Sequence, residues 1–234
     1  MAQVFDGITV LDFTRGMPGG IATMVMSDFG AEVIKVEAPS DEKFRKSPGA
    51  IQWNRGKKSV ILDLKTPQGR EKAHKLARLS DVVIESFRPG VTRRLGIDYA
   101  NLGANHPELV YASLTGFGAE GPYANYKGYD AVVAAKTGRM MMFAGQNTRE
   151  GPNYVVVQGV CHSAATALIR GITTALYLRE KTGRGQMVET SMLKTITTYD
   201  HISWIHGQMI AKDPETHPPD PRVGIGRPNP TGYL

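Results

Sequence analysis

The only cysteine of the chain lies at a predicted junction between a strand and a helix. In the stretch YVVVQGVCHSAATALIRG, residues 154–171, an apolar run typical of a short strand breaks at Gly159 and an Ala-rich helical segment follows. Cys161 therefore falls at the start of the predicted helix. The positive end of a helix lowers the pKa of a thiol and favours the nucleophilic thiolate. The position raises the hypothesis of a cysteine nucleophile.

Two observations favour an inert, buried thiol instead. His162 is the adjacent residue, but neighbours on a helix point about 100° apart, so it is poorly placed to act as the base. Cysteine is also among the residue types most often buried in protein cores. From the residues alone, both interpretations of Cys161 stay open.

Other residue types that could hold a cofactor give weaker signals. The glycines of MPGG, residues 17–20, could offer backbone amides to a phosphate, but they do not match the G-x-G-x-x-G pattern. A nicotinamide-dependent dehydrogenase is therefore disfavoured, although Glu37 ends the second predicted strand. The six histidines lack metal-ligand spacing and a lone cysteine excludes a multi-cysteine zinc site, so no metal is predicted. Asp130 is interpreted as an N-cap or first-turn carboxylate of a helix.

The elements that position these residues alternate between strand and helix. Apolar runs predict strands at residues 8–13, 32–37, 59–64, 81–87, 109–117 and in a segment beginning at 186. The last of these segments is expected to lead into a helix that reaches about residue 210. Thr66 and Pro67 are typical of a helix N-terminus, and a longer helix is predicted from 161 to about 181, ending at Gly183. This order predicts an α/β fold with a Rossmann-like, mostly parallel sheet and flanking helices.

The end of the sequence has a different composition. The segment KDPETHPPDPRVGIGRPNPTGYL holds six of the fourteen prolines. We therefore expect residues 1–200 to form the N-terminal part of a large domain. Residues 201–234 are expected to form the end of a helix and a Pro-rich linker toward a small domain that this chain does not contain.

Charge and hydropathy limit the partners. The net charge is +6, but the basic residues are scattered and no aromatic residues interleave with them, so nucleic acid binding is disfavoured. No apolar run approaches the ~20 residues that cross a membrane, and a cytoplasmic location is expected. The pattern favours a small polyanionic ligand held by a few cations.

Several segments, in order along residues 4–195, resemble class III coenzyme A transferases. They are VLDFTRGMPGGIATMVMSDFGAEVIKVEAP, NRGKKSVILDLKTPQGRE, DVVIESFRPGVTRRLGI, NHPELVYASLTGFGAEGPY, KGYDAVVAAKTG and ALYLREKTGRGQMVETSML. The resemblance implies transfer of CoA between an acyl-CoA thioester and a carboxylic acid. It also implies a fold in which two chains interlock, either as a homodimer or as a heteromer with a paralogue.

The resemblance also implies which residues contact acyl-CoA. An arginine that often follows the KVE strand in the family is replaced by Ala38, and Arg45 is expected to substitute for it. The groups NRGKK and TRRLG are expected to supply cations for the phosphates. The implied CoA-binding residues are Arg15, Met17, Pro18, Arg45, Leu62, Lys65, Ser86, Phe87, Arg94, Lys127 and Tyr129.

The nucleophile is where the sequence departs from the family. Class III transferases form an anhydride on an aspartate, and Cys161 stands at that position, with no acidic residue between Gly151 and Arg179. Three hypotheses follow: a non-catalytic CoA-binding subunit paired with an Asp-bearing paralogue, another acyl-CoA reaction of the isomerase, racemase or lyase type, or a catalytic Cys161. For the racemase branch the match is poorer, because Tyr129 replaces its histidine.

Overall fold

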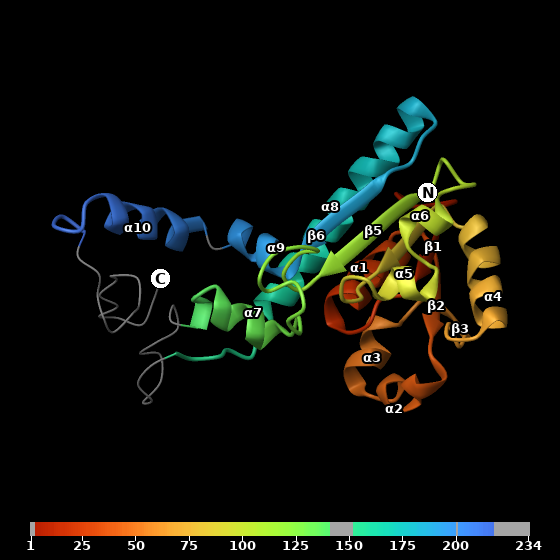
Figure 1. Ribbon diagram of the computed structural model, residues 1–234, viewed down its shortest axis with the longest axis horizontal. Helices are drawn as coiled ribbons and strands as arrows, with labels where there is room; N and C mark the ends of the chain where they lie inside the picture. The colour runs from red at the N-terminus through yellow and green to blue at the C-terminus, as the bar shows by residue number, and fades with distance from the viewer. Residues whose placement is uncertain (1–2, 141–151, 200, 218–234) are drawn as a thin grey trace.

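The protein is built on one parallel β-sheet of six strands (Figure 1). The computed structural model describes residues 3–140, 152–199 and 201–217. The strands are β1 (Thr9–Asp12), β2 (Glu32–Glu37), β3 (Lys58–Ile61), β4 (Val82–Glu85), β5 (Val110–Thr115) and β6 (Met187–Ser191), in the order β3-β2-β1-β4-β5-β6. Every pairing is parallel. The predicted α/β class with a mostly parallel sheet is confirmed.

Helices cover both faces of the sheet. One face carries α1 (Met17–Asp28) and the long helix α8 (Gly159–Thr182), and the other carries α4 (Pro67–Arg78), α5 (Val91–Leu95) and α6 (Tyr99–Leu102). Figure 1 shows α10 (His201–Lys212) extending away from the sheet. The remaining helices are η1 (Pro39–Asp41), α2 (Glu42–Arg45), α3 (Pro48–Trp53), α7 (Asp130–Lys136) and α9 (Met192–Tyr199).

The side chains of the central strands alternate between two hydrophobic cores, one on each face of the sheet. Because successive strand residues point to opposite faces, residues in register across β1, β4 and β5 fill one core while their neighbours fill the other. Val10, Val82 and Val110 pack with α1 and α8. Leu11, Val83 and Tyr111 pack with α4 and α6. The continuous apolar strand runs in the sequence reflect this burial on both faces.

Local signals set the helix ends where the sequence predicts them. The Thr66 hydroxyl accepts a hydrogen bond from the Gly69 N–H at 3.0 Å, with Pro67 as the first residue of α4. Gly183 ends α8 with φ of +68°, a left-handed conformation that glycine adopts without steric cost.

The predicted strand at residues 154–158 is wrong. This segment is irregular, and Val156 is 96% exposed. Its valines favour an extended backbone, but a strand needs a hydrogen-bonded neighbour, and β6 already occupies the free side of β5. The predicted linker lies mostly at residues 218–234, outside the described residues, so the division into domains stays a prediction.

Candidate functional site

The candidate site lies where the strand order reverses, between β1 and β4. Ligands of open α/β sheets bind at the carboxyl ends of strands at such a point. The loops that follow these two strands are hydrogen-bonded to each other. The Arg15 N–H donates to Ser86 Oγ at 2.8 Å, and Ser86 Oγ donates to the Arg15 carbonyl at 3.2 Å. The sheet therefore fixes both loops in one place.

A long groove runs along these loops. Its two parts have volumes of about 850 Å³ and about 530 Å³ and share Arg15, Phe87 and Val91 as lining residues. The larger part, here the inner groove, reaches Tyr129 and Cys161. The smaller part, the outer groove, lies between Leu62 and Arg94. The shared residues show that the two parts are adjacent.

The groove brings together nearly all of the residues that the sequence analysis singled out. The inner groove is lined by Arg15, Met17, Pro18, Ser86, Phe87, Lys127, Tyr129 and Cys161. The outer groove is lined by Arg15, Leu62, Lys65, Phe87 and Arg94. Arg45 lines neither part, because its guanidinium pairs with Glu37 at 2.8 Å and donates to Ser59 at 2.6 Å.

The cations of the groove differ in part from those expected. The cations of NRGKK line neither part of the groove, and Arg55 pairs with Asp28, Lys57 with Asp12 and Lys58 with Glu32, so their expected role at the phosphates stays a prediction. Arg70 and Arg88 line the groove instead, and the sequence analysis missed both. Arg88 directly follows Phe87 in the loop after β4. Its position at the carboxyl end of a predicted strand could have identified it as a groove residue.

A close approach of two glycines brings residues 127–130 over the sheet. A Cβ on Gly116 would lie 2.5 Å from the Cα of Gly128, closer than any real contact. Only glycine at these positions lets the two backbones touch. This contact places Lys127, Tyr129 and Asp130 at the end of β5, on the wall of the inner groove.

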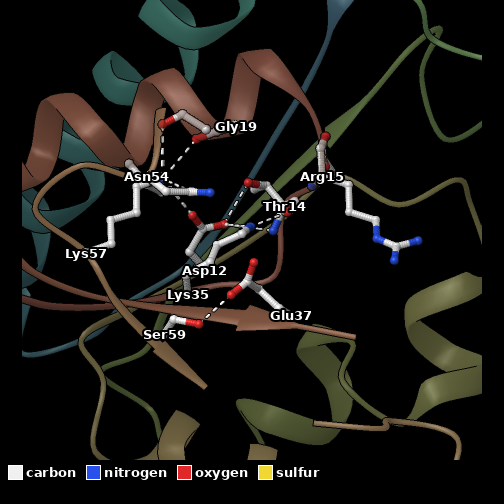
Figure 2. Close-up of polar contacts among 12 residues, drawn as sticks. Asp12, Thr14, Arg15, Gly19, Lys35, Glu37, Asn54, Lys57 and Ser59 are labelled. Carbon is white, nitrogen blue, oxygen red and sulfur yellow. Dashed lines mark hydrogen bonds and ion pairs between the residues drawn. The ribbon is translucent and has the colours of Figure 1, made fainter. Parts of the chain in front are cut away.

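Beneath the loop after β1 lies a buried cluster of charges (Figure 2). Asp12 is 0% exposed, and its carboxylate contacts the ammonium groups of Lys35 at 3.0 Å and Lys57 at 3.2 Å. It also accepts the Thr14 N–H at 2.8 Å and the Thr23 hydroxyl at 2.7 Å. The carboxylate therefore fixes Thr14, the residue that begins the loop carrying Arg15.

Charge pairing decides the ionisation of this cluster. Burial by itself would raise the pKa of Asp12, but Lys35, Lys57 and the two threonine hydroxyls outweigh it and hold the pKa well below the usual range. Burial lowers the pKa of Lys57, with Asp12 opposing that shift and Lys35 adding to it. Asp12 stays an anion between two cations.

Cys161 lies at the inner end of the groove, in the first turn of α8. Its side chain is buried, whereas the side chain of His162 is exposed, so the two point to different surroundings. The Cys161 N–H donates to Asp130 Oδ1 at 2.7 Å, and the Tyr154 hydroxyl donates to Asp130 Oδ2 at 3.1 Å. Asp130 is the first residue of α7, as the sequence analysis interpreted it, but its carboxylate also caps α8.

The surroundings of Cys161 suppress its thiolate form. Burial raises the pKa of the Cys161 thiol far above its usual value, and the negative charge of Asp130 and a hydrogen bond to that carboxylate raise it further. The same effects, burial first and Asp130 second, raise the pKa of Tyr154 to about 12. The helix N-terminus was expected to lower the pKa of the thiol. This effect is outweighed, because the Asp130 carboxylate already lies at the N-terminus of α8.

We therefore expect slow reaction of Cys161 with thiol reagents. At pH 8, Ellman's reagent should modify the native protein at least ~100-fold more slowly than the protein in guanidinium chloride, because the thiolate is scarce and buried. The chain has a single cysteine, so the absorbance change reports one site. Equal rates in the two conditions would show an accessible, reactive thiol.

Within the described residues, no group of three or more His, Cys, Asp or Glu side chains is arranged to hold a metal ion. None of the helices in the described part of the chain is long and apolar enough to cross a membrane.

Fold and site define an α/β protein with an elongated, cation-lined groove at the carboxyl ends of its strands. Residues 5–228 match the model of CoA-transferase family III. The chain belongs to this family, as its sequence segments predict.

Individual relatives agree with this assignment. The chain is 39% identical over 203 residues to the probable fatty acyl-CoA transferase Rv3272 of Mycobacterium tuberculosis, covering 82% of this chain and 51% of the relative. It is 38% identical over 200 residues to the acetyl-CoA:oxalate CoA-transferase of Acetobacter aceti, covering 80% and 50%. A crystal structure of Rv3272 superposes with a TM-score of 0.83 at 35% identity, covering 94% of this chain and 62% of that one. The chain spans about half the length of the curated relatives it matches.

Proposed function

We propose that this protein binds coenzyme A esters in the groove and transfers CoA between an acyl-CoA thioester and a carboxylic acid. The observation that carries the proposal is the groove, whose two adjacent parts share Arg15, Phe87 and Val91. Its outer part offers Lys65, Arg70 and Arg94 to phosphates, and its inner part ends at the position of the family's nucleophile. Guanidinium and ammonium groups are the usual protein partners of phosphate oxygens.

The names of relatives suggest which carboxylates to test. Relatives include an acetyl-CoA:oxalate CoA-transferase, formyl-CoA:oxalate CoA-transferases and a succinate–glutarate CoA-transferase. Oxalate, formate, succinate and glutarate are small carboxylates that suit a site reached through cationic walls. We propose an acceptor of this class, in an interlocked homodimer or in a heteromer.

Binding tests the proposal first. Calorimetry on the intact protein should detect CoA, and Arg94→Ala should weaken that binding by about 10- to 100-fold, the effect of losing a charged hydrogen bond. Arg93→Ala is the matched control, because Arg93 is the exposed neighbour on α5 and lines neither part of the groove. Equal losses in both variants, or no heat with CoA, would refute the proposed groove.

Exchange assays then test transfer. Acetyl-CoA, formyl-CoA and succinyl-CoA are each incubated with the four carboxylates, and the new thioesters are separated by chromatography. A second candidate, a non-catalytic CoA-binding subunit paired with an Asp-bearing paralogue, is favoured by the protonated thiol of Cys161. It predicts CoA binding by the isolated protein and exchange only after the paralogue is added.

A further inference from the structure

One carboxylate stands at the inner end of the groove although position 161 lacks one. Among the described lining residues of the inner groove, Asp130 is the only acidic side chain. It is 8% exposed and belongs to α7, while its hydrogen-bond partners Tyr154 and Cys161 belong to the segment before α8 and to α8. The carboxylate is thus held between two helices, at the wall of the groove.

We propose that Asp130 is the catalytic nucleophile of this protein and accepts the acyl group that the family's aspartate accepts at position 161. The proposal rests on the proposed function, since it concerns the same transfer reaction. It assigns the chemistry to a residue on a different helix from the one that the family resemblance indicates.

The distance between Asp130 and Cys161 places the carboxylate at the same end of the inner groove as position 161. With Oδ1 only 2.7 Å from the Cys161 nitrogen, the carboxylate lies beside the backbone from which a side chain at 161 projects. A nucleophile on either residue therefore reaches the same part of the inner groove.

Helix α8 supports an anion at this place. It has 24 residues, and Gly159, Val160 and Cys161 are its first three. The N–H groups of a first turn lack partners within the helix and carry partial positive charge, which stabilises a carboxylate. Asp130 accepts one of these N–H groups and the Tyr154 hydroxyl, and each of its oxygens keeps a further lone pair for attack.

Cys161 is a poor competitor for the acyl group. To attack, it would first lose its proton, and the carboxylate hydrogen-bonded to the thiol is that of Asp130. Burial and the charge of Asp130 both raise the pKa of the thiol, so transfer of that proton to a carboxylate is strongly uphill. A carboxylate needs no such step, because it attacks as the anion.

The reaction balances without a co-reactant. An Asp130 oxygen bonds to the thioester carbon, the C–S bond breaks, and CoA leaves as a thiolate. The thiolate attacks the Asp130 carboxyl carbon of this anhydride and the donor carboxylate leaves, giving an aspartyl-CoA thioester. The acceptor carboxylate then attacks that carbon and releases CoA thiolate. The thiolate finally attacks the acceptor carbonyl, and Asp130 leaves as a carboxylate.

Trapping with hydroxylamine tests the assignment on the intact protein. Hydroxylamine is added during turnover of the thioester and carboxylate pair that the exchange assay identifies, starting with acetyl-CoA and oxalate. The amine attacks the activated carboxyl carbon, so we expect a hydroxamate on the peptide that contains Asp130. Turnover with a hydroxamate on another residue, with an acyl group on Cys161 in an acid-quenched sample, or with no mark would overturn the proposal.

Variants supply an independent measurement. Asp130→Asn should reduce exchange at least ~1,000-fold, as expected for loss of a nucleophile, while CoA binding by calorimetry stays within a factor of about three. Glu120→Gln is the charge-matched control, because Glu120 is exposed and lines neither part of the groove. Exchange by Asp130→Asn at the rate of the control would overturn the assignment.

The outcomes separate this proposal from the proposed function. CoA binding and exchange without a hydroxamate on Asp130 overturn the role of Asp130 and leave the proposed function standing. Absence of CoA binding or of exchange overturns the proposed function itself, and the role of Asp130 with it.

Discussion

Replacing Asp12 with asparagine is expected to lower the free energy of unfolding by about 3–5 kcal/mol, the typical cost of breaking a buried ion pair by removing one partner. The wild-type carboxylate is fully buried between Lys35 and Lys57 (Figure 2). Asparagine keeps the shape and one acceptor oxygen but leaves two buried ammonium groups without a counter-charge. Urea unfolding at pH 7, followed by circular dichroism, measures the difference.

Asp28→Asn is the control for this prediction. Asp28 forms an ion pair with Arg55 at the surface, where both side chains are about 40% exposed. Solvent screens such a pair, so its loss should cost at most about 1 kcal/mol. If Asp12→Asn costs no more than this control, the cluster is not the structural support of the Arg15 loop.

The sequence predicted the sheet because its signals are local. Runs such as VLDF and EVIKVE concentrate apolar and β-branched residues over a few positions, and Gly16 and Pro39 follow shortly after them. Such runs favour a strand of a buried parallel sheet. The same locality explains the confirmed ends of α4 and α8 at Thr66 and Gly183. Valines at 154–158 misled the prediction, because strand formation depends on a partner that the segment does not have.

The site was predicted less completely because several of its side-chain contacts depend on tertiary packing. Strand order places Arg15 beside Ser86, and the family resemblance indicated both. Lys57, in contrast, lies in a run of basic residues that is typical of a surface, and only the fold turns it toward Asp12. The contact between Asp130 and Cys161 joins residues 31 positions apart, so helix propensity alone identified Asp130 as a first-turn residue and not as a partner of α8.

Protein stability should fall as pH rises from about 4.5 to about 7, because of Glu85 at the end of β4. The side chain is 4% exposed, and burial raises its pKa from 4.5 to about 7. Hydrogen bonds from Ser113 and the Phe87 N–H oppose the shift, and the negative charge of Glu189 adds to it. The folded protein therefore holds a proton that the unfolded chain has already released. The contribution of this group is fully present below pH 4.5 and is lost by about pH 7.

Glu85→Gln isolates this effect. Glutamine stays neutral and keeps an oxygen for the Phe87 N–H, which the carboxylate accepts at 2.7 Å in the wild type. The variant should exceed the wild type in free energy of unfolding by about 3 kcal/mol at pH 8 and match it near pH 4.5, since a shift of one pKa unit corresponds to about 1.4 kcal/mol. Urea unfolding of both proteins between pH 4.5 and 8 at constant ionic strength gives the difference directly. Parallel curves across this range would mean that Glu85 is ionised in the folded protein near its ordinary pKa. A difference that grows with pH would show that burial disfavours the ionised form of Glu85, even though the N–H of Phe87, on the loop shared by both parts of the groove, donates a hydrogen bond to it.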